Sequence, residues 1–174
     1  VRFGLNTGAA SGGDTPNWGY GRQGSGALSG LSFYRFDPNY HVDLILFREV
    51  IGTVTNAVYL NPYAQARFFE SPEQRMEVQL DAIASRALRG RGTPAATPKN
   101  KWLGFELDAA VRYLRLDKFH AELEGGILFP FGALDGRRGK RRLTFPTDGI
   151  SETFTDPATS SIAWTIQANL AWQF

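Results

Sequence analysis

The last residues of the chain, 161–174, read SIAWTIQANLAWQF and alternate between apolar residues and polar or small ones. One parity is apolar from Ile162 through to Phe174, with Trp164 and Trp172 between them. A period of two is typical of a β-strand whose two faces meet different surroundings. The segment therefore predicts a strand with one apolar face, and that face continues to the final residue.

The composition limits the fold without deciding it. The chain has 174 residues, a hydrophobic fraction of 43%, a formal net charge of +2 and no cysteine. This length allows one domain with a sizeable core, and the lack of cysteine excludes disulfides and thiolate metal sites. No stretch reaches the roughly 18 apolar residues that a transmembrane helix needs. Strands of a membrane barrel carry only about 10 residues of alternating character, so this test does not detect them.

The same alternation recurs in five earlier segments. They are VRFGLNTG (1–8), VYLNPYAQARF (58–68), MEVQLDAIAS (76–85), LGFELDAAVRYL (103–114) and FHAELEGGIL (119–128). The connections between them alternate between long and short, and the long ones are 9–57, 86–101 and 130–160. An up-and-down meander with all its long loops at one end is typical of outer-membrane barrels. We therefore expect one all-β domain over 1–174, an antiparallel transmembrane β-barrel with about six strands here and these three loops on the extracellular side.

Charged side chains of these segments fall on the parity opposite the apolar residues. Burying so many carboxylates in a dry core would be costly, whereas a water-filled lumen can hold them. The predicted lumen-lining residues are Arg67, Glu77, Asp81, Glu106, Asp108, Arg112, His120, Glu122 and Glu124. Such an acidic lining favours cations in a pore. A network of satisfied ion pairs without a transport role would give the same pattern.

A soluble antiparallel barrel or sandwich would turn the same apolar parity inward and the carboxylates outward. The period alone does not separate the two arrangements. Aromatic positions favour the membrane barrel, because these residues fall near strand ends, where interfacial aromatic girdles lie. The residues concerned are Trp102, Tyr113, Phe119, Trp164 and Trp172.

Two resemblances support an outer-membrane location. NLAWQF (169–174), with Leu170, Trp172 and Phe174, is similar to the C-terminal signal by which the barrel-assembly machinery of Gram-negative bacteria recognises outer-membrane proteins. YHVDLILFREVIGTVTNAVYLNPYAQARF (40–68), LGFELDAAVRYL and GGILFPFGALD (125–135) resemble the C-terminal part of a family of large, porin-like outer-membrane barrels without assigned catalytic residues. The resemblance implies a fold and a bacterial outer-membrane location, with membrane lipid and the assembly machinery as partners, and implies no chemistry.

Six strands cannot close around a lumen lined with charged side chains, because even eight leave an interior that side chains fill. Members of the resembling family are longer than this chain, so we expect strands to be missing upstream. The alternative is that LSGLSFYRF (28–36) and VDLILFREV (42–50) form two further strands and complete a small eight-stranded barrel.

The segment HVDLILFREVIGTV (41–54) is the least loop-like part of the first long connection. It has apolar residues at helical spacing, Val42, Ile45, Leu46, Val50 and Val54, with Gly52 as a helix stop. We expect a short helix there. It would either constrict the lumen, with Arg48 and Glu49 at its polar tips, or pack over the barrel rim.

Basic residues gather in two of the long loops. The denser group is Arg137, Arg138, Lys140, Arg141 and Arg142. Arginine suits the phosphates of lipopolysaccharide, whereas the alternative is a solvated basic loop. Nucleic-acid binding is not expected, because no aromatic residues interleave with these charges.

The predicted function is porin-like, passive passage of small polar solutes or ions through an acidic lumen. The alternative is a structural or surface-interaction barrel whose basic loops bind lipopolysaccharide or another partner. An enzyme is not expected: His41 beside Asp43 lacks the context of a Ser nucleophile, and the paired carboxylates that a glycosidase uses resemble a lining here. No cofactor or metal is expected, and a homo-oligomer is left open.

Overall fold

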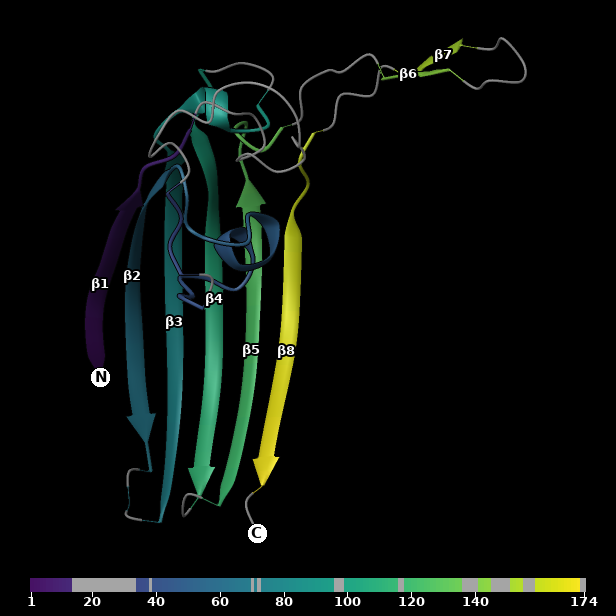
Figure 1. Ribbon diagram of the computed structural model, residues 1–174. Coiled ribbons are helices and arrows are strands. Elements are labelled where there is room, and N and C mark those ends of the chain that lie inside the picture. Colours follow the sequence, from purple (N-terminus) through teal and green to yellow (C-terminus); the bar gives the residue numbers. More distant parts are fainter. Residues whose placement is uncertain are drawn as a thin grey trace.

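The computed structural model describes residues 1–13, 34–37, 39–69, 71, 73–95, 99–115, 118–135, 141–144, 151–154 and 159–172. Six strands form one antiparallel sheet in the order β1-β2-β3-β4-β5-β8. They are β1 (Arg2–Ala10), β2 (Ala57–Phe68), β3 (Gln74–Ala87), β4 (Trp102–Arg115), β5 (Phe119–Pro130) and β8 (Ala163–Trp172). The predicted all-β, antiparallel up-and-down sheet is confirmed (Figure 1). The sheet is open, and β1 and β8 are its edges among the described strands.

The long connections meet at one end of the sheet and the short turns at the other (Figure 1). A short 3-10 helix, η3 (Gly90–Gly92), lies in the second long connection. The third contains a hairpin of β6 (Arg141–Thr144) and β7 (Ser151–Phe154), which the sequence analysis did not predict. Each of these strands has four residues, too short for alternation to stand out. No described helix is long and apolar enough to cross a membrane.

One face of the six-stranded sheet, here called the apolar face, is uncovered. The exposed fraction of its large exposed side chains ranges from 37% for Val111 to 78% for Phe3. They are Phe3, Leu5, Leu60, Leu80, Leu107, Val111, Leu123, Trp164, Ile166, Leu170 and Trp172. Within the described residues, this parity is exposed and is not packed into a core.

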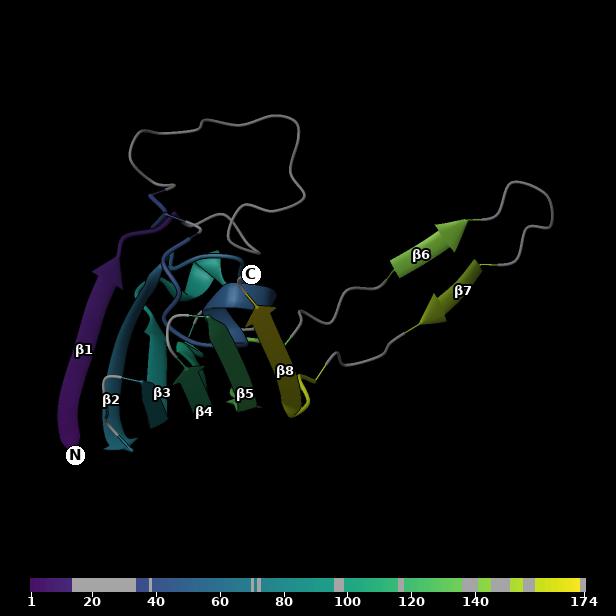
Figure 2. The same cartoon turned by 90° about the horizontal axis from the view of Figure 1, so that it is seen from below.

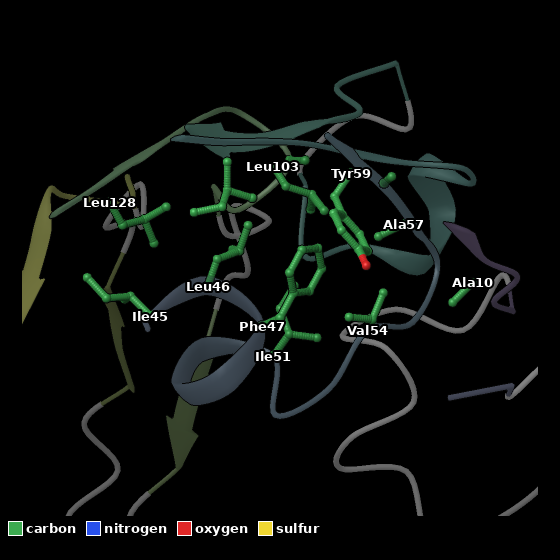
Figure 3. Close-up of a cluster of buried hydrophobic side chains, with 13 residues drawn as sticks. Ala10, Ile45, Leu46, Phe47, Ile51, Val54, Ala57, Tyr59, Leu103 and Leu128 are labelled. Atoms are coloured by element: carbon green, nitrogen blue, oxygen red, sulfur yellow. The ribbon is translucent and has the colours of Figure 1, made fainter. Parts of the chain in front are cut away.

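The opposite, polar face is covered near the long-connection end by residues 39–56, here called the strap. The strap runs over the sheet and includes the helical turn η2 (Leu46–Val50), as Figures 1 and 2 show. Buried residues of the strap pack against Tyr59, Leu103 and Leu128 of the sheet. Figure 3 shows the strands arching over this cluster, so the polar face is the concave one.

The predicted helix is a single π-helical turn. Its hydrogen bonds run from the Val50 amide to the Ile45 carbonyl and from the Ile51 amide to the Leu46 carbonyl, each at 2.9 Å. Because the π turn is wider than an α turn, Phe47 enters the buried cluster and Val50 is 49% exposed. The expectation that Val50 would lie on the helix's apolar side is therefore wrong.

The C-terminal end of the strap is hydrogen-bonded to residues 34–36. The Phe36 amide donates to the Val54 carbonyl at 3.0 Å, and the hydroxyls of Thr53 and Thr55 donate to the carbonyls of Phe36 and Tyr34, each at 2.8 Å. Within 34–37 and 39–56 these contacts form no strand. The alternative of two additional sheet strands is therefore wrong for the described part of this connection.

Candidate functional site: a strap over a charged sheet face

A row of alternating charge crosses four strands on the polar face. The strand register aligns Arg67 of β2 with Glu77 of β3, Arg112 of β4 and Glu122 of β5. Arg67 Nε lies 3.2 Å from Glu77 Oε2, and Arg112 Nη1 lies 3.7 Å from Glu77 Oε1. We call these four residues the charge row. Period-two alternation placed them on one face, and the antiparallel register brings them side by side.

Arg112 is the centre of this network. Its Nε donates to Glu122, its Nη2 donates to Glu124 Oε1 at 3.0 Å, and its Nη1 donates to Gln79 Oε1 at 3.0 Å. A planar guanidinium with several donors suits this arrangement of acceptors. Five of the predicted lining residues, including Glu124, therefore form one ion-pair network. His120 is half-buried nearer the short-turn end of the same face, opposite Leu114.

Glu106 and Asp108, two of the predicted lining residues, are both buried. Glu106 is fully buried beneath the strap. Its Oε1 accepts hydrogen bonds from the amides of Leu44 at 3.1 Å and Ile45 at 2.7 Å, and its Oε2 accepts one from Leu46 at 2.9 Å. The energetic cost of burying this carboxylate is offset by hydrogen bonds from these three consecutive backbone amides of the strap.

Two aspartates extend this arrangement. Asp108 Oδ2 accepts from the Leu44 amide at 3.1 Å, and Asp43 Oδ1 accepts from Phe47 at 2.9 Å and Arg48 at 3.2 Å. We call Asp43, Glu106 and Asp108 the acid clamp. Burial, aided by the charge of Glu106, raises the pKa of Asp43 to about 8. The clamp was not predicted from the sequence, although an Asp directly before an apolar helical segment is a recognised start signal.

A glycine of β5 lets the strap approach closely. Gly126 pairs with Asp108 across the sheet, and a Cβ at Gly126 would lie 2.4 Å from Asp108 Oδ1 and 3.4 Å from Leu44 Cβ. The buried Oδ1 has no hydrogen-bond partner among the described atoms. The missing side chain at position 126 therefore makes the notch that holds this carboxylate.

A cavity of about 320 Å³ lies between the strap and the sheet. The strap contributes His41, Asp43 and Arg48 to its wall. The sheet contributes charged side chains from three strands, namely Asp81, Asp108, Arg112 and Glu124. Four acidic side chains and two guanidinium groups line it, so the cavity is polar and holds groups of both charge types. Arg112 is already bonded to three carboxylates.

The two predicted constriction residues differ in position. Arg48 lines this cavity, whereas the side chain of Glu49 is 62% exposed and lies 3.5 Å from Arg48 Nε. Asp43 uses its carboxylate to hold the turn, so it does not orient His41 as a catalytic dyad requires. Within the described ranges, no three His, Cys, Asp or Glu side chains form a metal-binding group.

The remaining predicted residues lie elsewhere. Leu170 and Trp172 are exposed on the apolar face, and Phe174 lies outside the described residues. Arg137, Arg138 and Lys140 also lie outside them, whereas Arg141 and Arg142 belong to β6 and pair with Phe154 and Thr153. These last two therefore lie in a hairpin within the predicted outer loop 130–160.

Comparisons of the chain with protein-family models, with curated proteins and with solved structures give no match.

Proposed function

We propose that this chain forms part of the wall of an outer-membrane β-barrel whose lumen passes small cations and other small polar solutes by diffusion. The observation that carries the proposal is the opposite character of the two sheet faces. Large apolar side chains are exposed on one face, and a charge network with a polar cavity occupies the other. A lipid-facing wall with a wet interior has this alternation.

The exposed apolar face is too continuous for an ordinary soluble surface. It extends across all six strands, from Phe3 on β1 to Trp172 on β8. Monomeric soluble proteins rarely expose a contiguous apolar patch beyond about 300–600 Å². Contact with lipid chains would remove this face from water. Because unpaired backbone groups are costly in lipid, further strands beside β1 and β8 would complete the wall.

The strap would act as the constriction of the lumen. It lies on the concave face and is fixed by the acid clamp, and the cavity of about 320 Å³ lies between it and the sheet. Asp81 and Arg48 face this cavity from opposite sides, one on the sheet and one on the strap. Their charges would act on a passing solute in opposite directions. Beside the strap, the polar face of the sheet carries more carboxylates than guanidinium groups, which would favour cations; the residues are Glu77, Asp81, Glu122 and Glu124 against Arg67 and Arg112.

The test is single-channel conductance of the full chain in a planar bilayer under a salt gradient. We expect conductance steps with a cation-selective reversal potential. Asp81→Asn should reduce the cation preference and Arg48→Gln should increase it, because both change the charge of the cavity. Glu73→Gln is the control, since Glu73 is exposed at the short-turn end, away from the cavity.

A chain that inserts into the bilayer but gives no conductance would overturn the passage of solutes and leave a plugged or structural barrel. Conductance with an unchanged reversal potential in Asp81→Asn and Arg48→Gln would retain the pore. It would show that the strap cavity does not set its selectivity.

A further inference from the structure

We propose that the short-turn end of the apolar face holds a binding site for the headgroup of an anionic phospholipid. This inference rests on the proposed location of the sheet in a membrane. The site is a hollow of about 420 Å³ lined by Tyr113, Arg115, Lys118, Phe119 and Trp172. It combines three aromatic rings with two cations, and it lies apart from the strap and the charge row.

The strand register builds this site. Arg115 of β4 pairs with Phe119 of β5, which pairs with Trp172 of β8. The rings of Phe119 and Trp172 are 5.6 Å apart at 67°, and those of Tyr113 and Phe119 are 6.3 Å apart at 60°. Edge-to-face contacts of this kind stabilise aromatic clusters. The three rings therefore form one aromatic surface on adjacent strands.

The order of side chains along β4 matches the layers of a bilayer interface. Val111 is apolar, Tyr113 is aromatic and Arg115 is cationic, all on the same face, and Lys118 follows in the turn. The Lys118 amide donates to the Arg115 carbonyl at 2.9 Å, which brings the two cations to the same end of the sheet. Hydrocarbon, interfacial aromatic residues and phosphate-binding cations follow this order across a leaflet.

The charge of the hollow favours an anion. No ion pair joins Arg115 or Lys118 to a carboxylate in the described part of the chain. The turn sequence holds two cations against one carboxylate, Asp117, which lies outside the described residues. Arginine presents paired donors to phosphate oxygens, while the rings supply an apolar surface for the glycerol and the first acyl carbons. The ligand that fits this combination is a phospholipid with net negative charge.

The test uses the full chain in phosphatidylcholine vesicles with spin-labelled phosphatidylglycerol or spin-labelled phosphatidylcholine as the probe. Electron paramagnetic resonance measures the fraction of each label that the protein immobilises. We expect a several-fold preference for phosphatidylglycerol. Arg115→Gln with Lys118→Gln should abolish it, whereas Arg75→Gln with Lys99→Gln should keep it. The control removes the same charge from exposed residues, with Arg75 on the polar face at the same end and Lys99 at the other end.

The outcomes separate this site from the proposed function. A chain that floats with vesicles and shows no preference for phosphatidylglycerol, or equal loss in both double variants, would overturn the site alone. A chain that does not enter the bilayer would overturn both. Free glycerol 3-phosphate should not displace the labelled lipid, and displacement would show a phosphate site that needs no membrane, contrary to the proposal.

Discussion

Glu106 Oε1 lies 2.7 Å from the amide nitrogen of Ile45, so a fully buried carboxylate of β4 is bound by the backbone of the strap. The adjacent amides of Leu44 and Leu46 donate to the same carboxylate. Hydrogen bonds to a carboxylate are stronger than those between neutral groups, and leaving a buried donor unpaired is costly. The position of the strap on the polar face is therefore fixed mainly at this contact.

Replacing Glu106 with Ala should release the strap and leave the sheet paired. The buried amides of Ile45 and Leu46 would lose their acceptor, at about 1–3 kcal/mol each, whereas the Leu44 amide would keep Asp108 as its acceptor. Hydrogen exchange of Leu44, Ile45 and Leu46 in the full chain should accelerate by at least tenfold, equal to about 1.4 kcal/mol. In bilayers the same variant should conduct more than the native chain, because the constriction is lost.

The control for this variant is Glu122→Gln, which removes a carboxylate from the same face without touching the strap. Amides 44–46 should keep their protection there. Unchanged exchange in Glu106→Ala would mean that the buried cluster of Leu46 and Phe47 holds the strap without the clamp.

Gly126→Ala should weaken strap docking, and Gly125→Ala should not. A Cβ at position 126 would lie 2.4 Å from Asp108 Oδ1, so either that carboxylate or Leu44 must move, at a cost of about 1–3 kcal/mol. At position 125 the nearest atom would be 3.5 Å away, which is an ordinary contact. The measurement is the hydrogen-exchange rate of the Leu44 amide in the two variants. Equal rates would contradict the role of Gly126 in making room for Asp108 and the strap.

Much of the sheet could be predicted from the sequence, because period-two alternation is a local signal that six segments share. The alternation assigned Glu77, Arg112 and Glu122 to one face correctly. The ion pairs among them need the register, since a shift of one residue would move every side chain to the other face. The alternating row of charge could therefore be recognised only once the strands were aligned.

The site could be predicted only in part. Helical spacing indicated a turn near Leu46, but it could not show that the turn is π-helical and that Phe47 is buried while Val50 is not. Nor could it show that Glu106 binds the strap, because the partners lie about 60 residues apart in sequence. Long-range contacts between a carboxylate and backbone amides leave no residue-type pattern to detect.

Phe47→Ala should destabilise the strap far more than Val50→Ala, although both residues lie in η2. Phe47 is buried, with its ring 5.9 Å from that of Tyr59, and truncation of a buried Phe costs about 3–5 kcal/mol. Val50 is half-exposed, so its truncation should change stability by about 0.5 kcal/mol or less. Limited proteolysis within 39–56 reports strap release, and equal cleavage rates in the two variants would argue against the buried position of Phe47.

Docking of the strap should weaken as the pH rises. The pKa of Asp43 is raised from 3.8 to about 8 by burial and by the charge of Glu106, so the docked strap favours the protonated form. Between pH 4 and 8 the released strap binds fewer protons than the docked one. Docking therefore becomes less favourable as the pH rises across this window. Exchange of the Phe47 and Arg48 amides, corrected for intrinsic rates, should show this decline. Asp43→Asn should reduce the slope, whereas Asp37→Asn, at an exposed position, should not. A slope that Asp43→Asn leaves unchanged would assign the titration to another group.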